Sequence, residues 1–306
     1  MSDVVLAEYV RSGVVESEHR GYLIALNSDG STNLALGDVD HLFFPRSTVN
    51  SIQAAAMVRN GLQLPPHLLA FAASSHSGSA AHLELAREIL SMAKLDESAL
   101  QCMLDKPLGE TERRAWGDNP PTRIAMNCSG KHSAMLLTCV INGWSIDNYL
   151  DPEHPLQIAC RQELENLSGE KITLTSTDGC GAPLFLISVA GLARAIRAIT
   201  ISDDVAHTSV LAASKEFPEN VAGIGRLTTE MMQAVPGLYM KDGAEAVEVA
   251  SMPDGRTLVF KISDGSLRPF KAVLHAGLKR LGVDSPYQVE HVLGGGKAIG
   301  EIRATF

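Results

Sequence analysis

Apolar and polar residues alternate along the first part of the chain, and a period of two is typical of half-buried strands. The alternation holds over residues 4–11, 14–18 and 21–26, and the pair Asp29-Gly30 is a turn signal before a further run at 33–36. We therefore expect an antiparallel meander at the start of the chain.

Apolar residues at helical spacing dominate the middle of the chain, and the expected helices begin at capping residues or prolines. These helices cover residues 47–58, 80–93, 133–141, 152–167, 184–199, 205–216 and 224–234. Their caps are expected at Ser47 or Thr48, at Ser77 or Ser79, and at Asp151. A short strand is expected at 173–176, and the stretch 105–127, rich in proline, glycine and charge, is expected to be a surface loop.

Strand patterns return near the end of the chain. They cover residues 241–249 and 256–262, joined by a turn at Asp254-Gly255, and 298–305, after a helix over 268–281. This layout predicts an α+β fold in which an antiparallel sheet is flanked by helices and carries a helical insertion. The sheet is expected from residues 1–45 and 240–306, around a mainly helical middle at 46–239, in a single domain over residues 1–306.

Composition narrows the class of protein. The chain has 306 residues, of which 45% are hydrophobic and 20% charged, which is typical of a globular protein with a sizeable core. Its net charge of −9 and the lack of a Lys/Arg cluster argue against a nucleic-acid or anionic-membrane partner. No apolar run reaches the ~18 residues of a membrane span, and the N-terminus has no signal-peptide pattern. Five widely spaced cysteines favour reduced thiols and a cytoplasmic location.

The segment Phe44-Pro45-Arg46-Ser47 places a hydroxyl where an apolar helix is expected to begin. The partial positive charge of a helix N-terminus favours a developing anion at Ser47. In penicillin-recognising enzymes a lysine stands one turn further on, as Ser-x-x-Lys, and helps to remove the proton of the nucleophilic serine. This chain has Asn50 there, and the simpler alternative for Ser47 is a helix cap.

Two further polar segments are candidates for the same chemistry. In Ser74-Ser75-His76-Ser77-Gly78 a hydroxyl could relay a proton or orient a substrate, although the segment also suits a turn that caps the next helix. Lys241-Asp242-Gly243 is similar to the Lys-Thr-Gly strand of serine β-lactamases, and Lys261 precedes a second segment of this kind. The alternative for both lysines is an exposed turn.

Two cysteine segments suggest a metal site. Cys128-Ser129-Gly130-Lys131 pairs a thiol with an amine one helical turn apart, and Asp178-Gly179-Cys180-Gly181 offers a second thiol in a glycine-rich turn. Two thiolates brought together would suit Zn²⁺. The spacing between them matches no zinc-finger rule, so two buried free cysteines are the alternative.

Taken in order, these segments resemble one family over nearly the whole chain. The matching segments lie at residues 44–47, 75–78, 127–132, 178–183, 241–245 and 300–303. Cys-Ser-Gly-Lys-His followed by Asp-Gly-Cys-Gly is the most specific pair. The chain thus resembles the Rhizobium etli-type (class 3) L-asparaginases of the asparaginase II family. The resemblance implies a fold similar to penicillin-binding proteins and serine β-lactamases, and a homodimer that hydrolyses the side-chain amide of L-asparagine to L-aspartate and ammonia.

The same resemblance assigns roles to individual residues. It implies that Ser47 is the nucleophile or its close partner, and that Ser75 forms a second Ser–Lys pair with Lys241, for which Lys261 is the alternative. It also implies a zinc ion held by Cys128, Lys131, Cys180 and a water. The residues expected near the substrate are Arg46, His76, Gly130 and Asp178.

One departure from the family pattern affects the expected activity. The family has lysine where this chain has Asn50, and an asparagine cannot accept the proton of Ser47. Loss of a general base typically costs ~10²–10⁴-fold in rate, so we expect reduced activity or an inactivated variant. A related glutaminase or other amidohydrolase, and a non-catalytic relative that binds an amino acid, are the alternative functions.

Overall fold

The computed structural model describes residues 3–286 and 288–306, so the first two residues of the expected sheet region lie outside the described residues. The chain divides into two compact units. We call Met1–Thr48, Ile187–Ile201 and Ala234–Phe306 the sheet unit, and Val49–Leu186 and Ser202–Gln233 the helical unit. Whether both form a single catalytic domain stays a prediction.

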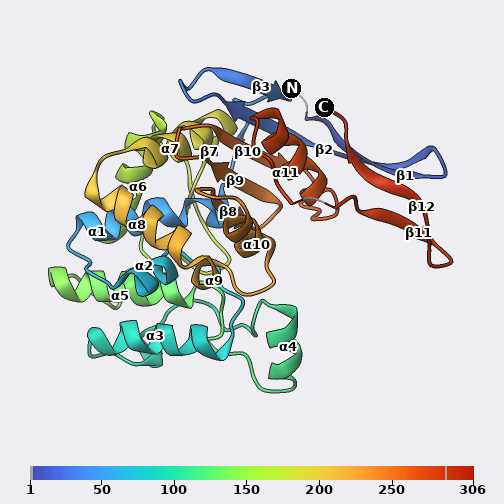
Figure 1. Ribbon diagram of the computed structural model, residues 1–306. Coiled ribbons are helices and arrows are strands. Elements are labelled where there is room, and N and C mark those ends of the chain that lie inside the picture. Colours follow the sequence, from blue (N-terminus) through green and yellow to red (C-terminus); the bar gives the residue numbers. More distant parts are fainter. Residues whose placement is uncertain (1–2, 287) are drawn as a thin grey trace. The chain divides into compact units, whose positions relative to one another are not determined.

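The sheet unit contains an antiparallel sheet built from both ends of the chain (Figure 1). Its described strands are β1 (Val4–Arg11), β2 (Val14–Leu26), β3 (Thr32–Leu36), β8 (Tyr239–Gly243), β9 (Val247–Ser251), β10 (Thr257–Ile262), β11 (His291–Gly294) and β12 (Lys297–Ala304). The order is β11-β12-β1-β2-β10-β9-β8, with β3 paired to β2. Because β1 pairs with β12, the prediction that strands from both ends share one sheet is confirmed.

Helices cover both faces of this sheet. On one face, Phe260 of β10 packs against Phe270 at the start of α11 (Phe270–Arg280), with ring centroids 5.0 Å apart. Neighbouring residues of a strand point to opposite faces. On the other face, Thr200 of α7 (Val189–Ile201) hydrogen-bonds Ser251 of β9, with 2.7 Å between the hydroxyl oxygens. The same unit holds the short pair β4 (Leu42–Phe43) and β7 (Ile187–Ser188).

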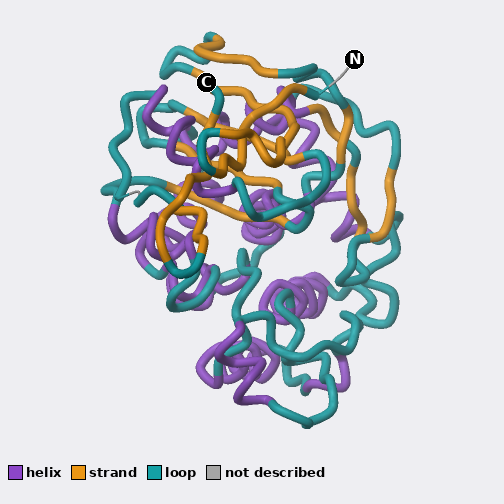
Figure 2. The backbone as a smooth tube through the Cα atoms, turned by 90° about the vertical axis from the view of Figure 1, so that its right-hand side faces the viewer, coloured by secondary structure: helices purple, strands orange, loops and turns teal. Residues whose placement is uncertain are grey.

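The helical unit consists mainly of helices that pack around α1. Figure 2 draws the helices of both units as purple coils. The described helices of the helical unit are α1 (Asn50–Arg59), α2 (Pro66–Ala72), α3 (Ala80–Met92), α4 (Glu110–Trp116), α5 (Ser129–Asn142), α6 (Pro155–Ser168), α8 (Val205–Glu216), α9 (Pro218–Val221) and most of α10 (Leu227–Ala234). Residues 50–57 of α1 are all buried, because α1 contacts α2, α5, α6 and α8. The strands β5 (Thr175–Thr177) and β6 (Pro183–Phe185) form a short hairpin.

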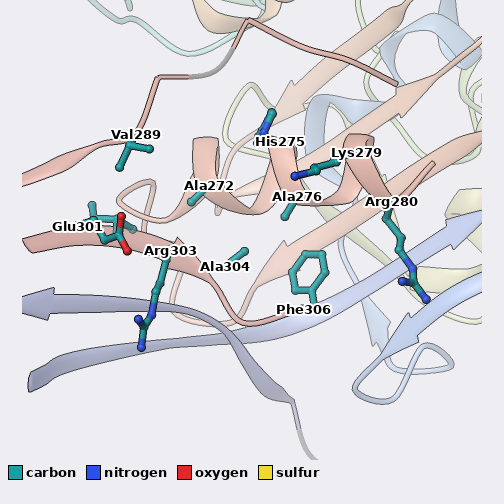
Figure 3. A pocket seen from close by; sticks show the side chains of 11 residues that line it. Ala272, His275, Ala276, Lys279, Arg280, Val289, Glu301, Arg303, Ala304 and Phe306 are labelled. Atoms are coloured by element: carbon teal, nitrogen blue, oxygen red, sulfur yellow. The ribbon is translucent and has the colours of Figure 1, made fainter. Parts of the chain in front are cut away.

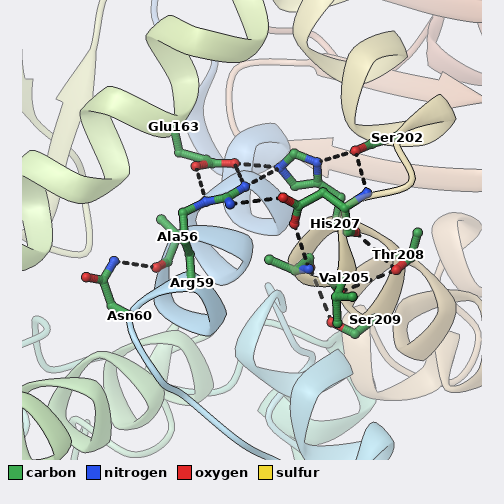
Figure 4. Close-up of polar contacts among 11 residues, drawn as sticks. Ala56, Arg59, Asn60, Glu163, Ser202, Val205, His207, Thr208 and Ser209 are labelled. Atoms are coloured by element: carbon green, nitrogen blue, oxygen red, sulfur yellow. Dashed lines mark hydrogen bonds and ion pairs between the residues drawn. The ribbon is translucent and has the colours of Figure 1, made fainter.

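A polar network fixes the far end of α1 (Figure 4). Arg59 donates to Glu163 of α6 over 3.0 Å and to Asp204 over 3.0 Å, and His207 of α8 lies 2.5 Å from Glu163. Burial opposes ionisation of Glu163, yet its hydrogen bonds from His207 and Arg59 hold its pKa below the ordinary value. The carboxylate therefore links three helices, and through them it fixes the position of α1.

The α+β prediction with a helical insertion is confirmed, but several expected boundaries are wrong. The cap of α1 is Val49, without a side-chain hydrogen bond, and Ser47 and Thr48 lie in the preceding 3-10 helix η1 (Arg46–Val49). The hydroxyl of Thr48 donates to the carbonyl of Pro45 instead, over 2.7 Å. Helix α6 begins only at Pro155 after the cap His154, because Asp151 accepts from the amide of Glu153 in a separate turn.

Three other expected elements also differ. The expected loop 105–127 contains α4, which has no buried residue and so lacks an apolar period. The expected strand 241–249 is two strands, β8 and β9, joined by a turn in which Glu245 and Ala246 have positive φ. The expected helix 184–199 begins as strand, and α7 starts only at Val189. Within the described part of the chain, no helix is long and apolar enough to cross a membrane.

Candidate active site

The predicted site residues fall into two groups, one in each unit. Arg46, Ser47 and Lys241 belong to the sheet unit, and the remaining eight belong to the helical unit. These eight are Asn50, Ser75, His76, Cys128, Gly130, Lys131, Asp178 and Cys180.

In the sheet unit, strand β8 runs directly beside the turn that carries Ser47. A Cβ atom on Gly243 would lie 3.0 Å from the carbonyl oxygen of Pro45 and 3.1 Å from Thr48 Cγ2, so this contact depends on the glycine. Arg46 has a φ of 53°, which is uncommon for a residue with a side chain and typical of tight turns at functional sites. The turn therefore presents Ser47, which is buried, in a strained and closely supported backbone.

Lys241 lies two residues before Gly243, on the same face of β8. Its side chain is fully buried, and its amine donates to the carbonyl of Asp242 over 2.6 Å and to the carboxylate of Asp242 over 3.1 Å. Lys261 of β10 instead donates to the carbonyls of Glu245 and Ile262, and burial lowers its pKa. Of the two candidate lysines, Lys241 is therefore the one on the strand that contacts the Ser47 turn.

In the helical unit, Ser75 lies in the extended segment between α2 and α3. Its amide donates to the carbonyl of Val221 over 2.9 Å, and the next amide donates to the carbonyl of Asn127 over 2.9 Å. The side-chain amide of Asn50 donates to the carbonyl of Ser74 over 2.8 Å, and its nitrogen lies 3.4 Å from the hydroxyl oxygen of Ser75. Asn50 and Ser75 are thus in contact in the interior of this unit.

The two cysteine segments lie together in the helical unit. Cys128 caps α5, Lys131 lies in its first turn, and Cys180 lies in the turn of the β5–β6 hairpin, all nearly fully buried. A hydrogen bond between the two sulfurs, together with burial, raises the pKa of Cys128 well above its ordinary value. The same hydrogen bond and the charge of Lys131 hold the pKa of Cys180 well below it. The two thiols therefore interact directly, and Lys131 favours a thiolate at Cys180.

Lys131 connects this pair to Asn50. Burial alone would lower the pKa of Lys131, but the sulfurs of Cys180 and Cys128 raise it above the ordinary value. Its amine also donates to Asn50 Oδ1 over 3.4 Å. Buried polar contacts thus run from Lys131 through Asn50 to Ser75, and Lys131 interacts electrostatically with the two sulfurs.

The chemistry of this donor set fits a zinc ion. Among residues 3–286 and 288–306, no group of three or more His, Cys, Asp or Glu side chains is placed to hold a metal, so a metal at the two sulfurs needs the amine of Lys131. Two thiolates, a neutral amine and Zn²⁺ sum to zero, so these groups could hold the metal without net buried charge among the four of them. Asp178 lies beside this set, with Oδ2 3.6 Å from Cys180 Sγ.

Two residues expected near the substrate have packing contacts. A Cβ on Gly130 would lie 2.6 Å from the ring of Phe71 and 2.7 Å from its carbonyl oxygen, so the glycine lets α5 approach α2. His76 is fully buried against Phe71 and His82 and shares a 2.9 Å hydrogen bond with the hydroxyl of Ser129. Burial lowers the pKa of His76 well below its ordinary value. Their assignment to substrate binding stays a prediction.

A further pair of side chains, His132 and Tyr149, lies near Cys180 and was not predicted as part of the site. His132 is fully buried, shares a 2.8 Å hydrogen bond with the hydroxyl of Tyr149, and helps to lower the pKa of Cys180. The Tyr149 hydroxyl also accepts from the amide of Gln101 over 3.1 Å. His132 belongs to the Cys-Ser-Gly-Lys-His segment and could have been found there, whereas nothing in the sequence marks Tyr149.

The sheet unit also has a hollow of about 550 Å³ away from the predicted site residues (Figure 3). Ala272, Ala276 and Lys279 of α11 line one side, and Ile302 and Ala304 of β12 line the other. None of the predicted site residues lines it, so its size alone does not make it the candidate site.

Comparison with known proteins gives a family and a set of structural neighbours. A family profile described as L-asparaginase II matches residues 7–303. No curated protein matches the chain. Among solved structures, a β-lactamase from Mycobacterium bovis is similar at a TM-score of 0.47 and 16% identity, over 85% of this chain and 94% of that one.

Two other β-lactamases are more distant. The one from Burkholderia vietnamiensis has a TM-score of 0.35 at 15% identity, over 79% of this chain and 82% of its own. The one from Desulfarculus baarsii has a TM-score of 0.32 at 15% identity, over 79% and 81%. All three neighbours are β-lactamases, the class of protein named in the fold prediction. Because their TM-scores are below 0.5, the likeness supports no conclusion about activity.

Proposed function

The chain belongs to the L-asparaginase II family, and on this premise we propose that it hydrolyses the side-chain amide of L-asparagine to L-aspartate and ammonia. The observation that supports this most is the buried contact series in the helical unit. It joins Lys131 to Asn50 and Ser75, and Cys180 and Cys128 act electrostatically on Lys131, although these segments are far apart in sequence. We also propose the Rhizobium etli-type (class 3) assignment, which rests on the segments at 127–132 and 178–183.

The proposed chemistry is acyl transfer through a serine. The hydroxyl oxygen of Ser47 attacks the side-chain carbonyl carbon and its proton passes to a base. The base then returns this proton to the amide nitrogen as the C–N bond breaks, and the nitrogen leaves as ammonia. Water then hydrolyses the ester and releases aspartate. The proposed base is the amine of Lys241, which donates hydrogen bonds to the carbonyl and the carboxylate of Asp242. Arg46 and Asp178 are proposed to contact the substrate.

We propose that Cys128, Lys131 and Cys180 hold a zinc ion. When bound there, the cation would supply positive charge that polarises a carbonyl oxygen or lowers the pKa of a bound water. The chain's own contribution is the buried donor set, in which Lys131 must present a neutral amine. A homodimer is proposed from the family resemblance, and a cytoplasmic location is supported by five cysteines that are all free thiols.

A second candidate function is that of a non-catalytic relative that binds an amino acid. The observation that favours it is Asn50, whose amide is fully engaged by Ser74, Ser75 and Lys131 and cannot take a proton.

Ammonia release separates these functions. The assay uses L-asparagine, L-glutamine and short peptides with the wild-type chain, Asn50→Lys, and Asn50→Lys carrying Ser47→Ala. If the chain is an asparaginase, it releases ammonia from L-asparagine. Asn50→Lys should then raise this release, and the added Ser47→Ala should remove it. Preference for glutamine or peptides identifies another amidohydrolase. If neither the wild type nor Asn50→Lys releases ammonia, and calorimetry shows that L-asparagine binds, the chain is a non-catalytic protein that binds an amino acid.

A further inference from the structure

Asn50 has polar partners at both ends of its side-chain amide. Its side chain is fully buried, and its nitrogen donates to the carbonyl of Ser74 over 2.8 Å. A carbonyl accepts only from a donor, so this contact fixes which end of the amide is nitrogen. The oxygen must then face the amine of Lys131, 3.4 Å away, and the nitrogen also faces the hydroxyl oxygen of Ser75, 3.4 Å away.

We propose that Asn50 is a positioning residue that couples the amine of Lys131 to the hydroxyl of Ser75, so that occupancy of the proposed metal site changes the reactivity of Ser75. This inference rests on the proposed zinc site and goes beyond it. It assigns a role to the residue that departs from the Ser-x-x-Lys pattern, and it makes the metal a regulator of a hydroxyl that does not touch it.

The coupling follows from the donors and acceptors present. A free ammonium has three N–H bonds that can turn toward Asn50 Oδ1, whereas an amine that gives its lone pair to a cation has only two, in directions set by the bond to the metal. Metal binding would therefore change the direction from which Lys131 donates to Asn50 Oδ1. Asn50 also restrains the amine in a position from which it can bind a metal. At the other end, the Asn50 N–H points at the oxygen of Ser75. The O–H bond of Ser75 must then point away from Asn50. If the amide of Asn50 shifts, the direction of this O–H bond changes with it.

A purely structural role for Asn50 makes a different prediction. In that case the 2.8 Å bond to the Ser74 carbonyl would simply tie α1 to the segment after α2. Loss of the side chain would then lower stability without a selective effect on metal affinity or on Ser75. The neighbouring Ser51 offers a matched control, because it is equally buried on α1 and its hydroxyl has no hydrogen-bond partner among the described residues.

The first measurement is the zinc dissociation constant of the full chain, by competition with a chromogenic chelator. The variants are Asn50→Leu, which has a similar size, and Asn50→Ser, a smaller polar side chain that is used if the leucine variant does not fold. Loss of a residue that supports a metal ligand typically weakens binding ~10–100-fold, and we expect this for both variants. Ser51→Ala should keep the wild-type constant.

The second measurement is the rate at which a fluorophosphonate labels Ser75, followed by peptide mass spectrometry with and without zinc. We expect zinc to change this rate in the wild type and in Ser51→Ala, and to leave it unchanged in both Asn50 variants. Wild-type zinc affinity and a wild-type zinc effect in the Asn50 variants overturn the coupling while the zinc site stands. If the wild type binds no zinc, the metal part of the proposed function fails first, and the coupling with it.

Discussion

Replacement of Gly130 by alanine tests whether this position packs two helices together or contacts a substrate. The added Cβ would lie 2.6 Å from Phe71 Cε1 and 2.7 Å from the Phe71 carbonyl oxygen, where ordinary contact begins near 3.4 Å. The carbonyl belongs to the backbone of α2 and cannot rotate away. Helices α2 and α5 must therefore separate by about 0.7 Å, the difference between 3.4 and 2.7 Å.

The expected cost follows from two opposing terms. Overpacking of this kind costs ~1–3 kcal/mol, and alanine in place of glycine returns up to ~1 kcal/mol of helix propensity. We expect Gly130→Ala to lower the free energy of unfolding by ~1–2 kcal/mol, measured by urea denaturation. The exposed Val140→Ala on the same helix is the control and should stay within ~0.5 kcal/mol.

A second substitution identifies the source of the strain. Phe71→Leu removes the ring contact but leaves the carbonyl contact, so the double variant should recover only part of the loss, with a coupling of at least ~0.5 kcal/mol. Wild-type stability of Gly130→Ala together with a raised KM for L-asparagine would refute the packing argument and support the substrate-binding prediction for this glycine.

Three further outcomes are expected. Cys128→Ala should abolish the expected one zinc per chain in metal analysis, and retained zinc would contradict the ligand set. Lys241→Ala should remove ammonia release, whereas Lys261→Ala should spare most of it, and the reverse result would exchange their roles. Glu163→Gln should lower the free energy of unfolding by ~1–3 kcal/mol at neutral pH, because Arg59 loses a charged partner. Since the folded-state pKa of Glu163 lies below its ordinary 4.5, this stabilisation is present above that pH and is lost as the pH falls through the folded pKa. A difference between wild type and variant that persists unchanged in acid would refute it.

Sequence patterning predicted the elements that have apolar alternation or a long apolar run. The meander of β1, β2 and β3 was predictable because apolar and polar residues alternate and turn residues separate the runs, although residues 21–26 of β2 are buried on both faces and β3 has no fully buried residue. Helix α5 was predictable from its apolar run, and its residues 129–139 are all buried. In contrast, α4 buries none of its residues, and the turn between β8 and β9 uses Glu245 and Ala246 at positive φ, where the sequence has no glycine or asparagine to mark it.

The candidate site was predictable only as separate segments. The chemistry of a thiol and an amine one turn apart is legible in the sequence, and so is the unusual amide at position 50. The contact between Lys131 and Asn50 joins residues 81 positions apart, and no local pattern specifies it. It arises because α1 and α5 pack against each other in the helical unit, a consequence of tertiary burial that single-sequence periodicity does not contain.

Position 50 also links catalysis to metal content. A lysine introduced there would bring a second amine close to that of Lys131, which lies 3.4 Å from Asn50 Oδ1. Two charged amines at ~4 Å repel by ~4 kcal/mol at the effective dielectric typical of protein sites. The repulsion disappears when Lys131 is neutral, as a metal ligand must be. Any gain in ammonia release by Asn50→Lys should therefore require zinc and vanish with a chelator, whereas wild-type Asn50 tolerates both states of Lys131. A metal-independent gain would show that Lys131 is neutral for another reason or lies too far away to matter.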